Sequence, residues 1–139
     1  SMVEKETGAA EERPMVAAVF LNRLRDPAFS PRLLQSDPTT GYGCVRDRST
    51  APSCAAYEGL VTGEMNRDRL NLYSTYVREG LPPGPIANPG EAAIAAVLAP
   101  AAGPYLYFVA SGKGRHHFSA TYAEHLRAIR GEPAPASTP

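Results

Sequence analysis

The sequence has no excess of charge of either sign. Its 139 residues include 14 Lys and Arg and 14 Asp and Glu, so the formal net charge is zero at pH 7 with neutral histidines. Proteins that bind nucleic acid through its phosphates need a positive surface, and balanced charge argues against that class. We therefore expect no nucleic-acid partner.

Long apolar runs are also lacking. No stretch approaches the roughly 18 apolar residues of a membrane-spanning helix, and no charged start followed by an apolar segment indicates a signal peptide. The first residues already have a helical pattern with no cap ahead of them. We therefore expect a missing upstream part, with membrane association only through an N-terminal anchor there.

The length and the 43% of hydrophobic residues fit one globular domain with a core of its own. We place this domain at residues 1–131. The last residues, 132–139, are rich in Pro, Ala and Ser, and we expect a disordered tail there.

Only two cysteines occur, Cys44 and Cys54, in a stretch rich in Ser, Pro and charge. The absence of a Cys-x-x-Cys motif argues against a zinc site or a thioredoxin-like redox site. A disulfide that closes this loop is the favoured interpretation, and it would indicate an oxidising compartment. Two free thiols are the alternative.

Histidine is scarce too, and its three positions do not suit a metal. His116 and His117 point to opposite faces of a strand, and His125 lies on a following helical segment. We expect structural or surface histidines and no metal site. The nearby Ser-Gly-Lys-Gly run lacks the spacing of a phosphate-binding loop and fits a hairpin turn.

The segments that remain alternate between helices and loops. Residues 11–27 have apolar side chains at helical spacing, a proline near the start and arginines near the end, and they predict a core helix. Residues 105–119 contain two strand-like runs about a Gly-Lys-Gly turn and predict a hairpin. Further helices are expected over 2–8, after Asp37-Pro38, within 66–80, over 88–100 with Asn88 as the cap, and over 120–131. The fold class is thus α+β, mainly helical with a small β-hairpin sheet.

Residues 80–90, Gly-Leu-Pro-Pro-Gly-Pro-Ile-Ala-Asn-Pro-Gly, contain four prolines and three glycines. Proline lacks a backbone N–H, so this segment cannot be a helix or an interior strand. We expect an ordered wall of a cleft.

Two glutamates near the start, Glu4 and Glu6, are the first candidates for chemistry. Positions two apart on a helix point about 200° apart, so only one of them faces the interior. Glu6 follows Met2 by four residues and Val3 by three, which places it on the apolar side. Burial raises the pKa of a carboxyl group, and such a group can act as an acid on a glycosidic bond near neutral pH. The alternative is that Glu6 pairs with a basic residue such as Arg13 or Arg23.

Five blocks of the sequence resemble, in order and spacing, the catalytic region of the endolytic murein transglycosylases, the YceG-like family. The resemblance covers residues 1–130, and its blocks are MVEKETG, ERPMVAAVFLNRL, LLQSDPTTGYG, YSTYVREGLPPGPIANPG and YLYFVASGKGRHHFS. It implies a lysozyme-like domain of a bacterial, extracytoplasmic enzyme on the periplasmic side of the inner membrane. Such an enzyme cleaves the MurNAc–GlcNAc bond within peptidoglycan strands and leaves a 1,6-anhydro sugar end. The catalytic glutamate of the family corresponds to Glu6.

The reaction implied by the resemblance needs only one carboxylate and no cofactor. The nucleophile is the C6 hydroxyl of the MurNAc that is cleaved, so one residue can protonate the leaving oxygen and then accept the hydroxyl proton. Ordinary glycosidases need a second carboxylate for that step. The runner-up, Asp37, stands directly before Pro38, where a helix N-cap is the ordinary interpretation.

Polar residues in the matching blocks are candidate sugar contacts, since they offer amide, carboxylate, hydroxyl and ring groups. We expect substrate binding by Gln35, Asp37, Thr39, Tyr73, Tyr76 and Asn88, although each alone also fits a structural role. The chain departs from the family pattern at Ser74, at Arg115 and in a longer cysteine loop. These departures concern details of the cleft and not Glu6.

The implied partners are peptidoglycan glycan strands, with cell-wall synthases as further candidates. A non-catalytic glycan-binding or scaffold domain is the first alternative, and it would bind strands without releasing an anhydro sugar. A second alternative is a pyridoxal-phosphate lyase, because the family has carried an aminodeoxychorismate lyase label. That chemistry needs a lysine in a pocket, and the two lysines, Lys5 and Lys113, are expected on a solvent-facing side and at a turn.

Overall fold

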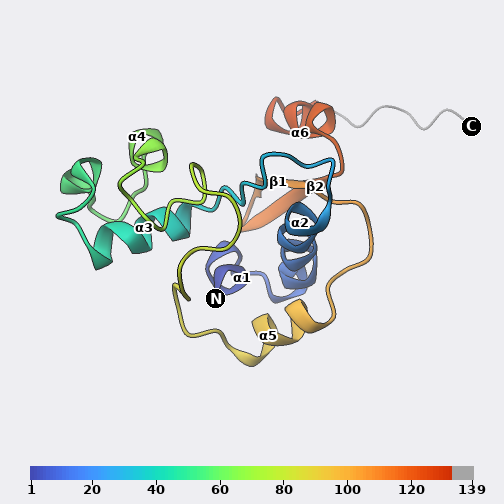
Figure 1. The fold of residues 1–139 in the computed structure, drawn as a ribbon. Coiled ribbons are helices and arrows are strands. Elements are labelled where there is room, and N and C mark those ends of the chain that lie inside the picture. The colour runs from blue at the N-terminus through green and yellow to red at the C-terminus, as the bar shows by residue number, and fades with distance from the viewer. Residues whose placement is uncertain (133–139) are drawn as a thin grey trace, which may run out of the picture.

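The computed structural model describes residues 1–132, and its elements form a main body and a smaller lobe (Figure 1). The main body contains α1 (Met2–Glu6), η1 (Ala10–Glu12), α2 (Arg13–Arg25), α5 (Glu91–Leu98), β1 (Tyr107–Gly112), β2 (Arg115–Ser119) and α6 (Tyr122–Ile129). The lobe contains α3 (Asp37–Arg46), η2 (Pro52–Ala56) and α4 (Gly63–Arg67). The predicted α+β class is confirmed. Of the expected tail, residues 133–139 lie outside the described part of the chain.

Helix α2 is the centre of the main body. Val16 and Val19 are fully buried on it, and α1, α5 and the hairpin pack around it. Met2 and Val3 bring α1 into the same core, where Phe20 meets Phe108 of β1 edge to face. The expected core helix over 11–27 is thus present, with its first residues in η1.

The hairpin closes the other side of the main body. Its strands pair antiparallel from Tyr107 opposite Ser119 to Gly112 opposite Arg115. The turn is left-handed at Lys113, with φ of 53°, between two glycines that also have positive φ. Helix α6 follows with a capping box, in which Thr121 and Glu124 satisfy each other's backbone N–H groups.

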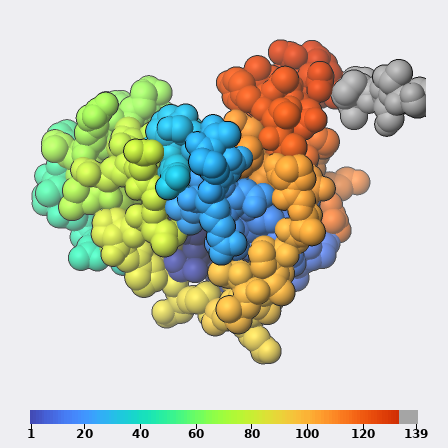
Figure 2. Space-filling view, turned by 45° about the vertical axis from the view of Figure 1, so that its right-hand side comes forward, coloured from blue at the N-terminus to red at the C-terminus, as the bar shows by residue number. Residues whose placement is uncertain are grey.

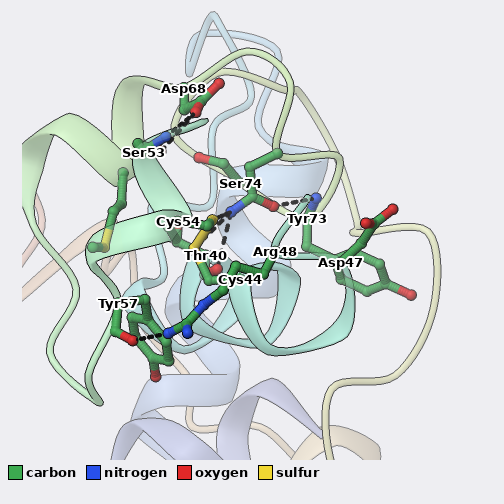
Figure 3. The surroundings of a disulfide bond; sticks show 12 residues. Thr40, Cys44, Asp47, Arg48, Ser53, Cys54, Tyr57, Asp68, Tyr73 and Ser74 are labelled. Carbon is green, nitrogen blue, oxygen red and sulfur yellow. Dashed lines mark hydrogen bonds between the residues drawn. A yellow bond between two sulfur atoms is a disulfide. The ribbon is translucent and has the colours of Figure 1, made fainter. Parts of the chain in front are cut away.

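The lobe has a separate core of four buried residues: Cys44, Ala51, Cys54 and Met65. Cys44 and Cys54 form a disulfide, which the sequence favoured over two free thiols (Figure 3). The buried side chain of Asn71 lies against this core and donates to the Thr40 carbonyl at 3.0 Å. A core this small buries little apolar surface, so the covalent link does part of the work that packing does in the main body.

One expected helix is absent, and two expected helices are present with a different N-cap. Residues 68–80 form turns, because the side chains of Asp68 and Asn71 accept hydrogen bonds from the N–H groups of Leu70 and Tyr73 and compete with helix formation. Helix α3 has Ser36 at its N-cap, so Asp37 is its first residue. Helix α5 begins at Glu91 with Gly90 at its N-cap, where the Gly90 N–H donates to Glu4, and Asn88 lies outside the helix.

Candidate active site

Glu6 is the last residue of α1 and lies where the main body meets the lobe. The chain becomes extended at Thr7, which ends the helix. The Glu6 carboxylate accepts a hydrogen bond on Oε1 from the hydroxyl of Ser36, the residue that precedes α3. Ser36 is 1% exposed, so its hydroxyl has a fixed position. Glu6 is therefore held from both parts of the molecule.

The surroundings of Glu6 favour its protonated form. Burial has the largest effect and raises the pKa of the carboxyl group, while the hydrogen bond from Ser36 lowers it. The negative charge of Asp37 raises the pKa further, and the positive charges of His116 and Arg23 lower it. The net result is a pKa above the ordinary value of 4.5.

Neither arginine considered in the sequence forms an ion pair with Glu6. Arg13 pairs with Glu4 at 3.4 Å, and Glu4 also accepts the Gly90 N–H at 3.0 Å. Arg23 is buried and donates to backbone carbonyls, among them Leu106 and Leu34 at 2.7 Å each. Glu4 thus has a structural role at the surface, while Glu6 takes the interior side, as helix geometry predicts.

Asp37 stands next to Ser36 and is exposed. Its Oδ1 accepts hydrogen bonds from the Tyr76 hydroxyl at 2.7 Å and from Asn66 Nδ2 at 2.9 Å. Burial, together with the hydrogen bond to Asp37, raises the pKa of Tyr76 far above its ordinary value of 10, so the hydroxyl remains a donor. Two of the predicted contacts, Asp37 and Tyr76, therefore lie together near Glu6.

Gln35 and Thr39 flank Ser36 but differ in exposure. Gln35 is exposed and has a left-handed backbone, with φ of 54°, and its N–H donates to the Thr75 carbonyl at 3.1 Å. Thr39 is fully buried, and its Oγ1 donates to the Ser36 carbonyl at 2.6 Å. A side chain with no exposed surface cannot touch a sugar, so Thr39 supports Ser36 and is not a direct contact in this structure.

Tyr73 and Asn88 form no hydrogen bond with Glu6. Tyr73 is 7% exposed, its ring packs on Tyr42 with centroids 4.8 Å apart, and its hydroxyl accepts from Arg46 at 3.0 Å. Tyr73 therefore has a structural role in the packing around Tyr42 and Arg46. Asn88 is exposed on the proline-rich segment, and no residue in 1–132 forms a hydrogen bond with its side chain.

A second buried carboxylate, Glu12, was not predicted from the sequence. Its Oε1 accepts the backbone N–H of His116 at 3.0 Å, and its Oε2 lies 2.8 Å from Nδ1 of the same histidine. The hydroxyl of Thr7, the residue after Glu6, is 3.4 Å from Oε2. Burial raises the pKa of Glu12, but the hydrogen bonds from His116 outweigh it, so the pKa lies below 4.5. The pair spans 104 residues, and no local pattern could reveal it.

A hollow of about 490 Å³ runs along α3, and we call it the α3 hollow. It is lined by Lys5, Asp37, Pro38, Gly41, Tyr42, Val45, Tyr57, Gly59, Leu60, Val61 and Ile86. Asp37 and Lys5, the neighbour of Glu6, join the hollow to the surroundings of the acid. Figure 2 shows the lobe, in green, packed beside the blue N-terminal segments of the main body.

Two further features bear on the candidate chemistry. Within residues 1–132, no three His, Cys, Asp or Glu side chains gather in a way that could hold a metal ion. None of the helices described in this range has the length and hydropathy needed to cross a membrane.

Comparison with known proteins shows which family the chain resembles. The family model described as the YceG-like family matches residues 1–131. An endolytic murein transglycosylase of Bacillus subtilis (strain 168) is 35% identical over 128 residues, which are 92% of this chain and 31% of that protein. A crystal structure of a YceG-like protein from Listeria monocytogenes is similar with a TM-score of 0.74 and 35% identity, over 92% of this chain and 37% of that one. The chain thus spans about a third of the length of each. It belongs to the YceG-like family.

Proposed function

We propose that this chain is the catalytic domain of an endolytic lytic transglycosylase that cleaves MurNAc–GlcNAc bonds within peptidoglycan strands. One observation carries the proposal: Glu6 is a partly buried carboxyl group of raised pKa at the boundary of body and lobe, directly beside an exposed polar cluster. The similarity to a murein transglycosylase supports the reaction class.

The geometry of Glu6 fits a residue that gives and then takes back one proton. The Ser36 hydroxyl donates a hydrogen bond to Oε1 of Glu6. Oε2 accepts no hydrogen bond from residues 1–132, so it is available to a substrate. The protonated carboxyl group donates to the glycosidic oxygen, and the bond from MurNAc C1 to that oxygen breaks. The C6 hydroxyl of the same MurNAc then bonds to C1, and its proton passes to Glu6. No water is consumed, and the product end is 1,6-anhydroMurNAc.

Asp37 supports this cycle through its charge. Its proximity raises the pKa of Glu6, which keeps the acid protonated, and a negative group beside the site stabilises positive charge that develops at C1. Tyr76 and Asn66 fix its orientation. Gln35 and Asn88 are exposed, and we keep them as proposed sugar contacts.

The proposed setting is extracytoplasmic. Peptidoglycan lies outside the cytoplasm, and the disulfide between Cys44 and Cys54 fits an oxidising compartment. The proposed anchor lies in a part of the protein upstream of this chain, on the periplasmic side of the inner membrane. Cell-wall synthases are proposed as partners because they produce the strands that this enzyme would cut.

The test compares Glu6→Gln with Glu4→Gln on purified peptidoglycan, with mass spectrometry of the released 1,6-anhydro products. Loss of a general acid costs about 10²- to 10⁴-fold in rate, so Glu6→Gln should form almost no product. Glu4→Gln should retain most of the activity, because Glu4 serves an ion pair at the surface. Both variants should keep the wild-type circular dichroism spectrum.

Two results would overturn the proposal. Near-normal product formation by folded Glu6→Gln would remove the assigned acid. Binding of strands by the wild type without any anhydro product would instead support a non-catalytic glycan-binding domain.

A further inference from the structure

We propose that the α3 hollow binds the peptide stem carried by the MurNAc residue that is cleaved. This inference rests on the proposed function and names a substrate feature for the same site. Residues next to Glu6 and Ser36 in the chain line the hollow, most of its walls are apolar, Lys5 adds a positive charge, and hydrogen bonding and a disulfide hold its outer wall in place.

The walls of the hollow suit aliphatic groups better than sugar hydroxyls. Val45 and Leu60 are 72% and 82% exposed, among the most exposed large hydrophobic residues in the described chain, and both open into this hollow. Val61 and Ile86 extend the same lining. Aliphatic side chains cannot hydrogen-bond hydroxyl groups, whereas they bury methyl groups favourably. Stem peptides are rich in alanine methyl groups, so their chemistry fits.

The lining of the hollow includes one positive charge that suits the carboxylates of a stem. Lys5 is exposed there, and its ammonium group forms no ion pair with any residue in 1–132. Stem peptides carry free carboxylates, for which an unengaged ammonium group is a complementary partner. Asp37 also lines the hollow, where its carboxylate accepts hydrogen bonds from Tyr76 and Asn66 and faces the charge of Glu6.

The connectivity of the substrate points the stem toward this hollow. In MurNAc the stem hangs from a lactyl group on C3 of the ring whose C1 is attacked. A ring placed with C1 at Glu6 must therefore release its stem within one sugar's width of that carboxyl group. Asp37 links the hollow to the acid: it lines the hollow, its charge acts on Glu6, and its neighbour Ser36 donates a hydrogen bond to the Glu6 carboxylate.

The outer wall is built to keep its position. Gly41 on α3 allows the close approach of Tyr57, whose hydroxyl would lie 2.9 Å from a Cβ added at Gly41. The Tyr57 carbonyl accepts a hydrogen bond from Arg48, and the disulfide ties the same segment to α3 (Figure 3). Gly59 provides the left-handed turn, with φ of 100°, that brings Leu60 and Val61 over the hollow. A fixed apolar wall is the form expected of a binding surface.

The test uses two matched ligands: soluble glycan strands that keep their stems, and the same strands stripped of stems by an amidase. Binding is measured with Glu6→Gln protein, so that cleavage does not interfere. We expect about tenfold tighter binding of stem-bearing strands. Val45→Ser/Leu60→Ser in the same background should lose this preference and bind stripped strands as before. Both residues are exposed, so folding should be unaffected.

Controls distinguish stem binding in the α3 hollow from nonspecific hydrophobic binding, and they distinguish binding from cleavage. Leu70→Ser/Leu98→Ser changes two residues that are 57% and 80% exposed and lie outside the hollow, and it should leave both affinities unchanged. Equal affinity for the two ligands, or equal losses for both in Val45→Ser/Leu60→Ser, would overturn the inference. A stem preference in binding with no anhydro product from wild-type protein would overturn the proposed function and leave the hollow assigned.

Discussion

Glu6 and Glu12 lie in one short segment, yet their surroundings shift the pKa values of the two carboxyl groups in opposite directions. Both groups lie near the extended stretch at Thr7, and both are removed from bulk water to a large extent. Glu6 receives one hydrogen bond, from Ser36, and its pKa is raised. Glu12 receives two from His116 and one from Thr7, and its pKa is lowered.

The difference shows that the number of donors, and not burial alone, decides which form of a carboxyl group the fold favours. Burial disfavours the charge in both places. At Glu12 three donors more than offset this cost, and the charge becomes a structural link between η1 and β2. At Glu6 the single donor does not offset it, so the fold favours the protonated form that the proposed acid needs. Variants at these two sites test this explanation.

The largest effect is expected from Glu12→Gln. The amide presents an N–H group where a carboxylate oxygen accepted from His116, and one buried donor loses its partner. We expect a loss of about 2 to 3 kcal/mol in the free energy of unfolding at pH 7, measured by urea denaturation. Glu11→Gln is the matched control: its partner Arg115 is in an exposed ion pair, so the change should be within about 0.5 kcal/mol.

The effect of Glu12→Gln should depend on pH. A carboxyl group with a lowered pKa contributes stability above the ordinary value of 4.5, and this contribution is lost as the pH falls through the pKa of the folded state. The difference between wild type and variant should therefore narrow in acid. A difference that stays constant down to pH 3 would contradict the assigned role of the charge.

A smaller effect of opposite sign is expected for the stability of Glu6→Gln. The folded state favours protonated Glu6, so wild-type stability is complete below 4.5 and declines as the pH rises through the raised pKa. The amide has no charge to lose. The variant should be more stable than wild type at pH 8 and equal to it at pH 4, as measured by thermal unfolding. A variant less stable at both pH values would show that the carboxylate itself is structural.

The smallest effect is expected for His116→Gln, in the pH dependence of activity. Its positive charge lowers the pKa of Glu6, so a neutral side chain should move the alkaline limb of the activity profile to higher pH. Asp37 and Arg23, the other charges near Glu6, remain in place. Glutamine can still donate to Glu12. His117→Gln, on the exposed adjacent position, should not move the limb; a shift in both variants would indicate a general change in surface charge.

The sequence predicts those parts of the site that depend on local geometry. The inward direction of Glu6 follows from its spacing to Met2 and Val3, and the hairpin follows from its turn residues. The predicted N-caps, Asp37 and Asn88, were wrong by one and two residues, because contacts with distant segments fix the backbone there: the Ser36 N–H donates to Thr75, and the Gly90 N–H donates to Glu4.

The partners of the site residues could not be predicted, because they are far apart in the chain. Ser36 lies 30 residues from Glu6, Tyr76 lies 39 from Asp37, and His116 lies 104 from Glu12. Only the fold brings such pairs together. Thr39 shows the same limit, since its polarity suggested a sugar contact and its burial gives it a structural role.

The disulfide has a consequence for how substrate preference can change. It closes a ring of sequence at the far end of α3, opposite the end that carries Asp37 and meets Glu6. Within that ring, residues can be inserted or exchanged while both ends stay fixed. The segment that follows it forms the outer wall of the α3 hollow. Changes inside the ring can therefore alter the outer wall of the hollow while Asp37, at the opposite end of α3, and Glu6, in the main body, keep their positions.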